Sequence, residues 1–126
     1  MRFLSMIRIN ETTCQPPTEQ LLADMGKLME EMTRAGVLIG TAGLTPSSDG
    51  VRLRLRGGKI TATDGPFTES KEVIGGYALL EANSKEEAIA HTRRFLAVHG
   101  DAWDIECELR QLQPDGECGG EPIRVN

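Results

Sequence analysis

Residues 51–67 have the sequence VRLRLRGGKITATDGPF, and this stretch decides how the rest of the chain is organised. Two runs of six residues flank Gly57 and Gly58, a two-residue loop that tolerates positive φ at both positions and is typical of a β-hairpin. Because side chains alternate along a strand, the hairpin is predicted to have one apolar face and one cationic face. The apolar face contains Val51, Leu53, Leu55, Ile60 and Ala62. The cationic face contains Arg52, Arg54, Arg56, Lys59, Thr61 and Thr63.

A sharp corner with the sequence DGPF, residues 64–67, ends the second strand of this hairpin. If the strand runs to its end, the alternation puts Asp64 on the apolar face, so we expect a carboxylate that points inward. An inward carboxylate would suit a general base or a ligand-anchoring group, which makes Asp64 the main candidate catalytic residue. The alternative is that the Asp64 carboxylate accepts backbone hydrogen bonds within its own Asp-Gly turn.

The composition is that of an ordinary globular domain, with 126 residues of which 39% are hydrophobic and 26% are charged. One Trp, one Tyr and three Phe make up the aromatic residues, so the core is predicted to be aliphatic and rich in methionine. The net charge of −5 argues against nucleic acid as a partner, because nucleic-acid binding needs a basic surface. There is no run of about 18 apolar residues, so we expect no membrane association.

The three cysteines, Cys14, Cys107 and Cys118, are odd in number, lie far apart and lack the paired spacing of a metal site. We therefore expect free thiols in a reducing cytoplasm and no bound metal. The chain also lacks a phosphate-binding loop and a dinucleotide-binding fingerprint, so no cofactor is predicted.

The apolar periodicity predicts a series of strands and helices that is interrupted by the hairpin. Without the hairpin, the order is β-α-β-β-α-β, which is the order of a ferredoxin-like α+β fold. We assign residues 1–112 to this domain and expect residues 113–126 to form a polar, flexible tail. The predicted strands are 2–9, 37–44, 51–56, 59–64, 73–82 and 104–112, and the predicted helices are 19–35 and 85–99.

Such a fold carries both helices on one face of its sheet and leaves the other face uncovered. A chain of this length has no third helix to cover that face. We expect a second copy to cover it, packed sheet to sheet in a two-fold homodimer. The alternative is a monomer whose hairpin folds over the open face.

Seven short sequence pieces lie in a fixed order along the chain. They are AGVL at 35–38, LTPSSDGVRLR at 44–54, GGK at 57–59, DGPF at 64–67, TESKEVIGGY at 68–77, SKEEAI at 84–89 and ECELRQL at 106–112. Through these pieces the chain resembles the YCII-related family in its DGPF branch, over roughly residues 1–112. The resemblance implies a ferredoxin-like fold that dimerises in the manner of the dimeric α+β barrel proteins.

Related YCII proteins are proposed to use a His–Asp pair in a cleft between sheet and helix, with the histidine on the first helix. Here the first helix has no histidine, and Met25 occupies that position. The resemblance therefore leaves open whether this chain is an enzyme. One hypothesis is a protein that binds or turns over a small molecule in a cleft near Asp64. The other is a non-catalytic interaction module or an accessory to a regulatory system.

The two histidines both fall in the second predicted helix. His99 continues the buried face of this helix, so it is a second candidate catalytic residue that would reach a cleft. Alternatively, His99 is a cation at the helix C-terminus that interacts with the helix dipole. His91 lies near the edge of the buried face and is predicted to be a surface residue.

Three further residues are candidates for ligand binding. Arg54, in the strip formed with Arg52 and Arg56, would hold an acidic substrate or a phosphate. The alternative for this strip is protection of a strand against edge pairing. Tyr77 would line the cleft or would be a core residue with a tethered hydroxyl group. Phe67, at the end of the corner, is the third candidate.

Overall fold

A computed structural model of the chain describes residues 1–13, 15–67, 73–101, 103–114, 117–118 and 121–122. In the described part the predicted elements appear in the predicted order, with bounds that agree to within about two residues. The elements are β1 (Arg2–Ile9), α1 (Glu19–Arg34), β2 (Leu38–Gly43), the 3₁₀ turn η1 (Ser47–Asp49), β3 (Val51–Arg56), β4 (Lys59–Asp64), β5 (Val73–Glu81), α2 (Lys85–Val98), β6 (Glu106–Gln111), β7 (Glu117–Cys118) and β8 (Glu121–Pro122).

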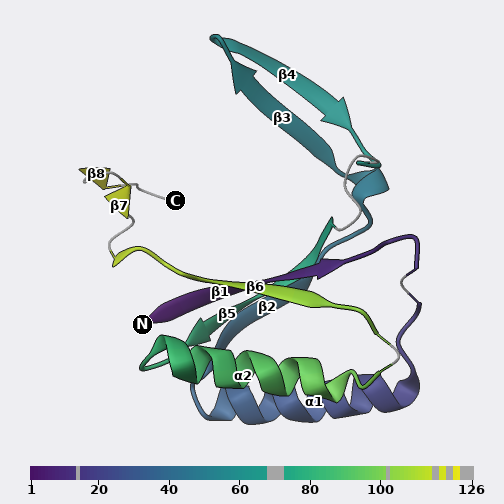
Figure 1. Cartoon of the computed structure of the whole chain (residues 1–126), viewed down its shortest axis with the longest axis vertical. Helices are drawn as coiled ribbons and strands as arrows, with labels where there is room; N and C mark the ends of the chain where they lie inside the picture. The colour runs from purple at the N-terminus through teal and green to yellow at the C-terminus, as the bar shows by residue number, and fades with distance from the viewer. Residues whose placement is uncertain (14, 68–72, 102, 115–116, 119–120, 123–126) are drawn as a thin grey trace.

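Four strands form an antiparallel sheet in the order β2-β5-β1-β6, and both helices cover one face of it (Figure 1). This arrangement confirms the predicted ferredoxin-like α+β fold. The core lies between the sheet and the helices, where Phe3 of β1 pairs with Leu80 of β5 and packs with Ala82 and Ala88. Leu21, Leu28 and Met32 of α1 are also buried.

Both helices begin where the sequence supplies a capping side chain. The Thr18 hydroxyl accepts a hydrogen bond from the backbone N–H of Leu21 at 3.1 Å. The Ser84 hydroxyl accepts one from the backbone N–H of Glu87 at 3.1 Å, and the Glu87 carboxylate accepts one from the N–H of Asn83 at 3.3 Å. These bonds satisfy donors that a helix N-terminus leaves unpaired, and so they fix the starts of α1 and α2.

Among the residues that the structure describes, none covers the face of the sheet that points away from the helices (Figure 1). Since Phe3 and Leu80 point toward the helices, alternation turns their strand neighbours Leu4 and Leu79 to the opposite face. The next pair on that face is Met6 with Tyr77, and the Tyr77 residue is 38% exposed. We call this surface the open face, and its apolar centre consists of Leu4, Met6, Tyr77 and Leu79.

The β3–β4 hairpin has the predicted register, with Arg56 opposite Lys59 and Val51 opposite Asp64. It stands away from the sheet, on the side opposite the helices (Figure 1). Its apolar face is exposed, with 70% of Leu53, 71% of Leu55 and 69% of Ile60 accessible to solvent. The alternative in which the hairpin folds over the open face of its own sheet is therefore wrong.

The tail beyond β6 is described only in part. Strands β7 and β8 pair antiparallel with each other, whereas residues 115–116, 119–120 and 123–126 lie outside the described residues. The predicted domain boundary and the flexibility of the tail therefore stay predictions. Neither of the described helices combines the length and apolar character required to cross a membrane.

Candidate functional site

The DGPF corner packs directly on η1. The backbone N–H of Gly65 donates a hydrogen bond to the carbonyl oxygen of Gly50 at 3.0 Å. A Cβ atom at Gly65 would lie 1.7 Å from the carbonyl oxygen of Ser47, so no other residue fits without displacement of the backbone. Gly65 is thus required by a close approach of two backbone segments.

A carboxylate from the loop after β1 holds the other side of η1. Glu11 accepts a hydrogen bond from the Ser47 backbone N–H at 2.6 Å and a second one from the Ser47 hydroxyl at 2.7 Å. Ser47 is buried, so these charge-assisted bonds satisfy polar groups that water does not reach. Three segments that are distant in the sequence therefore meet at the base of the hairpin.

A cleft of about 450 Å³ opens at this junction, a volume within the usual range of ligand sites. Its most polar contributors are the guanidinium groups of Arg8 from β1 and Arg52 from β3. The Arg52 guanidinium carbon lies 3.9 Å from the centre of the Phe67 ring, and Arg8 contacts the Glu108 carboxylate at 3.1 Å. We call this cleft the corner cleft. No acidic side chain is found among the described residues that line it. The other lining residues are Leu44, Thr45, Pro46, Ser47, Gly50, Val73 and Ile74.

Asp64 falls on the apolar face of the hairpin, opposite Val51, as the alternation predicts. That face is exposed, however, and the carboxylate does not point inward. Asp64 is absent from the lining of the corner cleft. Its carboxylate is exposed and makes no hydrogen bond to the described residues, so they show neither the inward carboxylate nor the alternative hydrogen bonds of an Asp-Gly turn.

The three candidate ligand-binding residues lie in different places. Phe67 lines the corner cleft, as described above. Arg54 lies two residues further along β3 than Arg52 and is exposed outside the cleft. Tyr77 belongs to the open face, and its carbonyl oxygen accepts a hydrogen bond from the Thr41 hydroxyl at 2.8 Å.

His99 is the C-cap residue of α2 and does not line the corner cleft. Its Nδ1 atom lies 2.9 Å from the carbonyl oxygen of Phe95. The imidazole packs edge to face against the rings of Phe95 and Trp103, with centroid distances of 4.8 and 5.8 Å. His99 therefore packs at the end of its helix, and the structure does not bring it together with Asp64.

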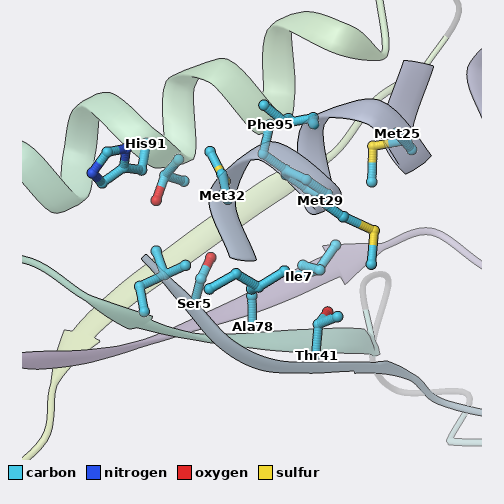
Figure 2. A pocket seen from close by; sticks show the side chains of 13 residues that line it. Ser5, Ile7, Met25, Met29, Met32, Thr41, Ala78, His91 and Phe95 are labelled. Carbon is cyan, nitrogen blue, oxygen red and sulfur yellow. The ribbon is translucent and has the colours of Figure 1, made fainter. Parts of the chain in front are cut away.

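A second, smaller cavity of about 50 Å³ lies between the helices and the sheet (Figure 2). Met25, which the resemblance puts in the place of the family histidine, is one of its lining residues. Other side chains around it are Met29 and Met32 of α1, His91, Thr92 and Phe95 of α2, and Ser5, Ile7, Thr41 and Ala78 of the sheet.

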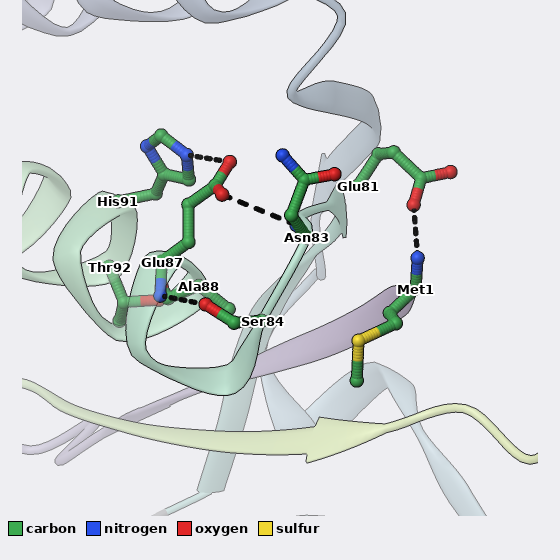
Figure 3. A network of polar contacts seen from close by, with 8 residues as sticks. All are labelled: Met1, Glu81, Asn83, Ser84, Glu87, Ala88, His91 and Thr92. Carbon is green, nitrogen blue, oxygen red and sulfur yellow. Dashed lines mark hydrogen bonds and ion pairs between the residues drawn. The ribbon is translucent and has the colours of Figure 1, made fainter.

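His91 lines this cavity, so its assignment as a surface residue was wrong. Its side chain is 18% exposed, and its buried Nε2 atom makes no hydrogen bond to the residues that the structure describes. A carboxylate oxygen of Glu87, one helical turn earlier, lies 3.5 Å from this Nε2 atom (Figure 3). This separation is longer than a hydrogen bond. The helical period puts His91 at the margin of the buried stripe, where periodicity alone does not decide burial.

Arg8 and Ser47 also belong to the site, although the sequence patterns did not predict it. Arg8 lies within the predicted strand 2–9, and Ser47 lies between two predicted strands. A signal was present in each case, because Arg8 interrupts an apolar strand and Ser47 follows a proline. Neither signal indicates that the two residues meet the DGPF corner, because that contact depends on how distant segments pack.

A model of the YCII-related domain matches residues 1–103, a range that includes the hairpin, the corner cleft and both helices. The chain is also similar to an uncharacterised protein of Rhizobium meliloti (strain 1021). The two are 32% identical over 99 residues, which make up 79% of this chain and 80% of that protein. With a family model that matches most of its length, the chain belongs to the YCII-related family.

Proposed function

We propose that this protein binds a small anionic molecule in the corner cleft, at the base of the hairpin. The observation that carries this proposal is the presence of two guanidinium groups, from Arg8 and Arg52, in a cleft with no acidic group among its described lining residues. Guanidinium groups bind carboxylates and phosphates through paired N–H donors. The aromatic ring of Phe67 limits the orientations that Arg52 adopts.

The cleft combines this charge with an apolar wall. Leu44, Val73 and Ile74 line it beside the two arginines. A molecule with an acidic group and a short apolar body matches both parts, and the volume of about 450 Å³ suits a small metabolite. We assign no reaction to the site, because Asp64 and His99 lie outside the cleft.

Calorimetric titration with inorganic phosphate and with short dicarboxylates tests the proposal. We expect Arg8→Gln and Arg52→Gln to weaken binding at least about 10-fold each, because each removes a charged hydrogen-bond donor. Arg54→Gln is the matched control, since Arg54 lies on the same strand outside the cleft. The proposal fails if no anion binds, or if the control weakens binding as much as the two cleft variants.

We further propose that the protein acts as a homodimer in which a second copy covers the open face, either sheet to sheet as in the dimeric α+β barrel proteins or through another segment of that copy. The exposed apolar face of the hairpin supports a second candidate function, a non-catalytic interaction module. Sedimentation equilibrium at micromolar concentration tests the dimer. A protein that stays monomeric would contradict it, whereas a dimer that binds no anion would leave the interaction module as the better candidate.

A further inference from the structure

The hairpin leaves four apolar side chains exposed on one face, and contiguous exposed apolar patches commonly mark interaction sites. Leu53, Leu55 and Ile60 are each about 70% exposed, Val51 is 53% exposed, and all four lie on one face. A two-stranded hairpin on its own is at best marginally stable in water. This face therefore requires a partner surface.

The partner surface does not belong to the same chain. Arg52, on the cationic face, lines the corner cleft together with Arg8 and Ile74 of the sheet. At its base, then, the hairpin turns its cationic face toward its own sheet and its apolar face away from it. The contact of Gly65 with Ser47 fixes this orientation, because the two backbones touch there.

The open face of the sheet is the second uncovered apolar surface. Its centre is formed by Leu4, Met6, Tyr77 and Leu79, and Tyr77 is 38% exposed. Two β-sheets that pack face to face bury surfaces of this kind against each other. Charge also favours self-association, since the hairpin carries four basic residues and one acidic residue while the whole chain has a net charge of −5.

We propose that the β3–β4 hairpin is an exchanged arm, whose apolar face packs on the open face of the sheet in a second copy of this chain. A two-fold axis makes the contact reciprocal, so each copy covers the open face of the other. This inference rests on the proposed homodimer and names the segment that forms it, because the partner's hairpin, and not its four-stranded sheet, then covers the open face. The ligand in the corner cleft plays no part in the argument.

Variants of the arm test this assignment by sedimentation equilibrium. The triple variant L53S/L55S/I60S removes the apolar face, and we expect it to weaken dimerisation at least about 100-fold. The matched control R54S/R56S/T61S changes the same number of residues on the cationic face of the same strands. We expect it to change the dissociation constant less than about 10-fold. Circular dichroism confirms that each protomer keeps its fold.

Cross-linking locates the contact directly. A photoreactive benzoylphenylalanine at position 55 is introduced, and unlabelled protein is mixed with ¹⁵N-labelled protein before irradiation. We expect cross-links that join an unlabelled to a labelled chain and end within β1 or β5. Cross-links confined to one chain, or ending on the helices, would overturn the proposal.

The outcomes separate this inference from the homodimer on which it rests. A monomeric wild-type protein would overturn both. A dimer that the triple variant leaves intact would overturn the arm alone. A dimer lost in the triple variant, with cross-links to the partner sheet, supports both.

Discussion

Gly65 lies against the carbonyl group of Ser47 so closely that a Cβ atom at Gly65 would be 1.7 Å from the carbonyl oxygen. We expect Gly65→Ala to lower the free energy of unfolding by about 1–3 kcal/mol, because one of the two backbone segments must move. Urea denaturation measures this change. Gly43→Ala is the control, since a Cβ there would have no neighbour within 4 Å, and equal midpoints for the two variants would contradict the close contact.

The carboxylate of Glu11 binds Ser47 from the side opposite the contact with Gly65. Glu11→Ala removes two short hydrogen bonds and leaves the Ser47 N–H buried and unpaired. We expect a loss of about 2 kcal/mol in the free energy of unfolding. Glu30→Ala is the control, because Glu30 forms only an exposed ion pair with Arg34, which is worth about 0.3–0.5 kcal/mol. If both variants lowered the free energy of unfolding equally, the hydrogen bonds to Ser47 would contribute no more to stability than the exposed ion pair.

The contrast between the hairpin and its base shows which features the sequence predicts. The register from Val51 to Asp64 follows from Gly57, Gly58 and strict alternation, which are local properties, and the structure reproduces it pair by pair. Alternation also gives the face on which Asp64 lies. It does not give burial, because burial depends on what covers that face, and none of the described residues covers it here.

The corner cleft depends on contacts that no local pattern contains. Arg8, Ser47 and Phe67 come from three segments, and their meeting depends on the tight approach at Gly65. The DGPF sequence indicates a turn, and it carries no information on which distant segment the turn touches. The fold was therefore predictable from periodicity and capping, whereas most residues of the candidate site were not.

Two glutamates on the sheet make stability depend on acid pH. The N-terminal ammonium group, 2.7 Å away, lowers the pKa of Glu81 below its ordinary value of 4.5. Arg110 and then Arg8 lower the pKa of Glu108 in the same way. A carboxylate with a lowered pKa in the folded state contributes stability above its ordinary pKa and loses it as the pH falls through the lowered value.

We therefore expect the urea midpoint to fall as the pH decreases below 4.5, and to fall less in E81Q and E108Q. The effect should weaken at high salt, because both carboxylates are exposed enough to be screened. Glu106→Gln is the control, since this exposed glutamate lies on the same strand as Glu108 and forms no ion pair among the described residues. A pH profile unchanged by both variants would contradict the assignment.

Cys107 is predicted to react slowly as a thiol. Burial raises its pKa above the ordinary value of 9.0, although a hydrogen bond with Ser5 acts in the opposite direction. The thiolate is the reactive species, so its population at neutral pH is small in the folded protein. Alkylation by iodoacetamide, followed by peptide mass spectrometry, should label Cys107 far more slowly in the folded than in the urea-unfolded protein. Ser5→Ala should slow the alkylation of Cys107 in the folded protein further. Equal alkylation rates in the folded and unfolded protein would exclude this effect of burial.

Replacement of His91 by leucine is expected to keep or raise the free energy of unfolding, whereas Gly65→Ala and Glu11→Ala are expected to lower it. An unpaired buried polar atom costs about 1–3 kcal/mol, so its removal should recover part of that cost. Leucine fills much of the same space and favours the helix by a few tenths of a kcal/mol. We therefore expect His91→Leu to keep or raise the free energy of unfolding.

His91→Ala separates the polar atom from the volume of the side chain. Alanine also removes Nε2, but it enlarges the cavity of about 50 Å³, so we expect a loss of about 2 kcal/mol relative to leucine. If His91→Leu instead destabilises the protein strongly, the 3.5 Å separation from Glu87 is an effective ion pair in solution. In that case, a double-mutant cycle that combines His91→Leu with Glu87→Gln gives a coupling energy between the two side chains. If Nε2 is unpaired, the effects of the two substitutions on the free energy of unfolding are additive.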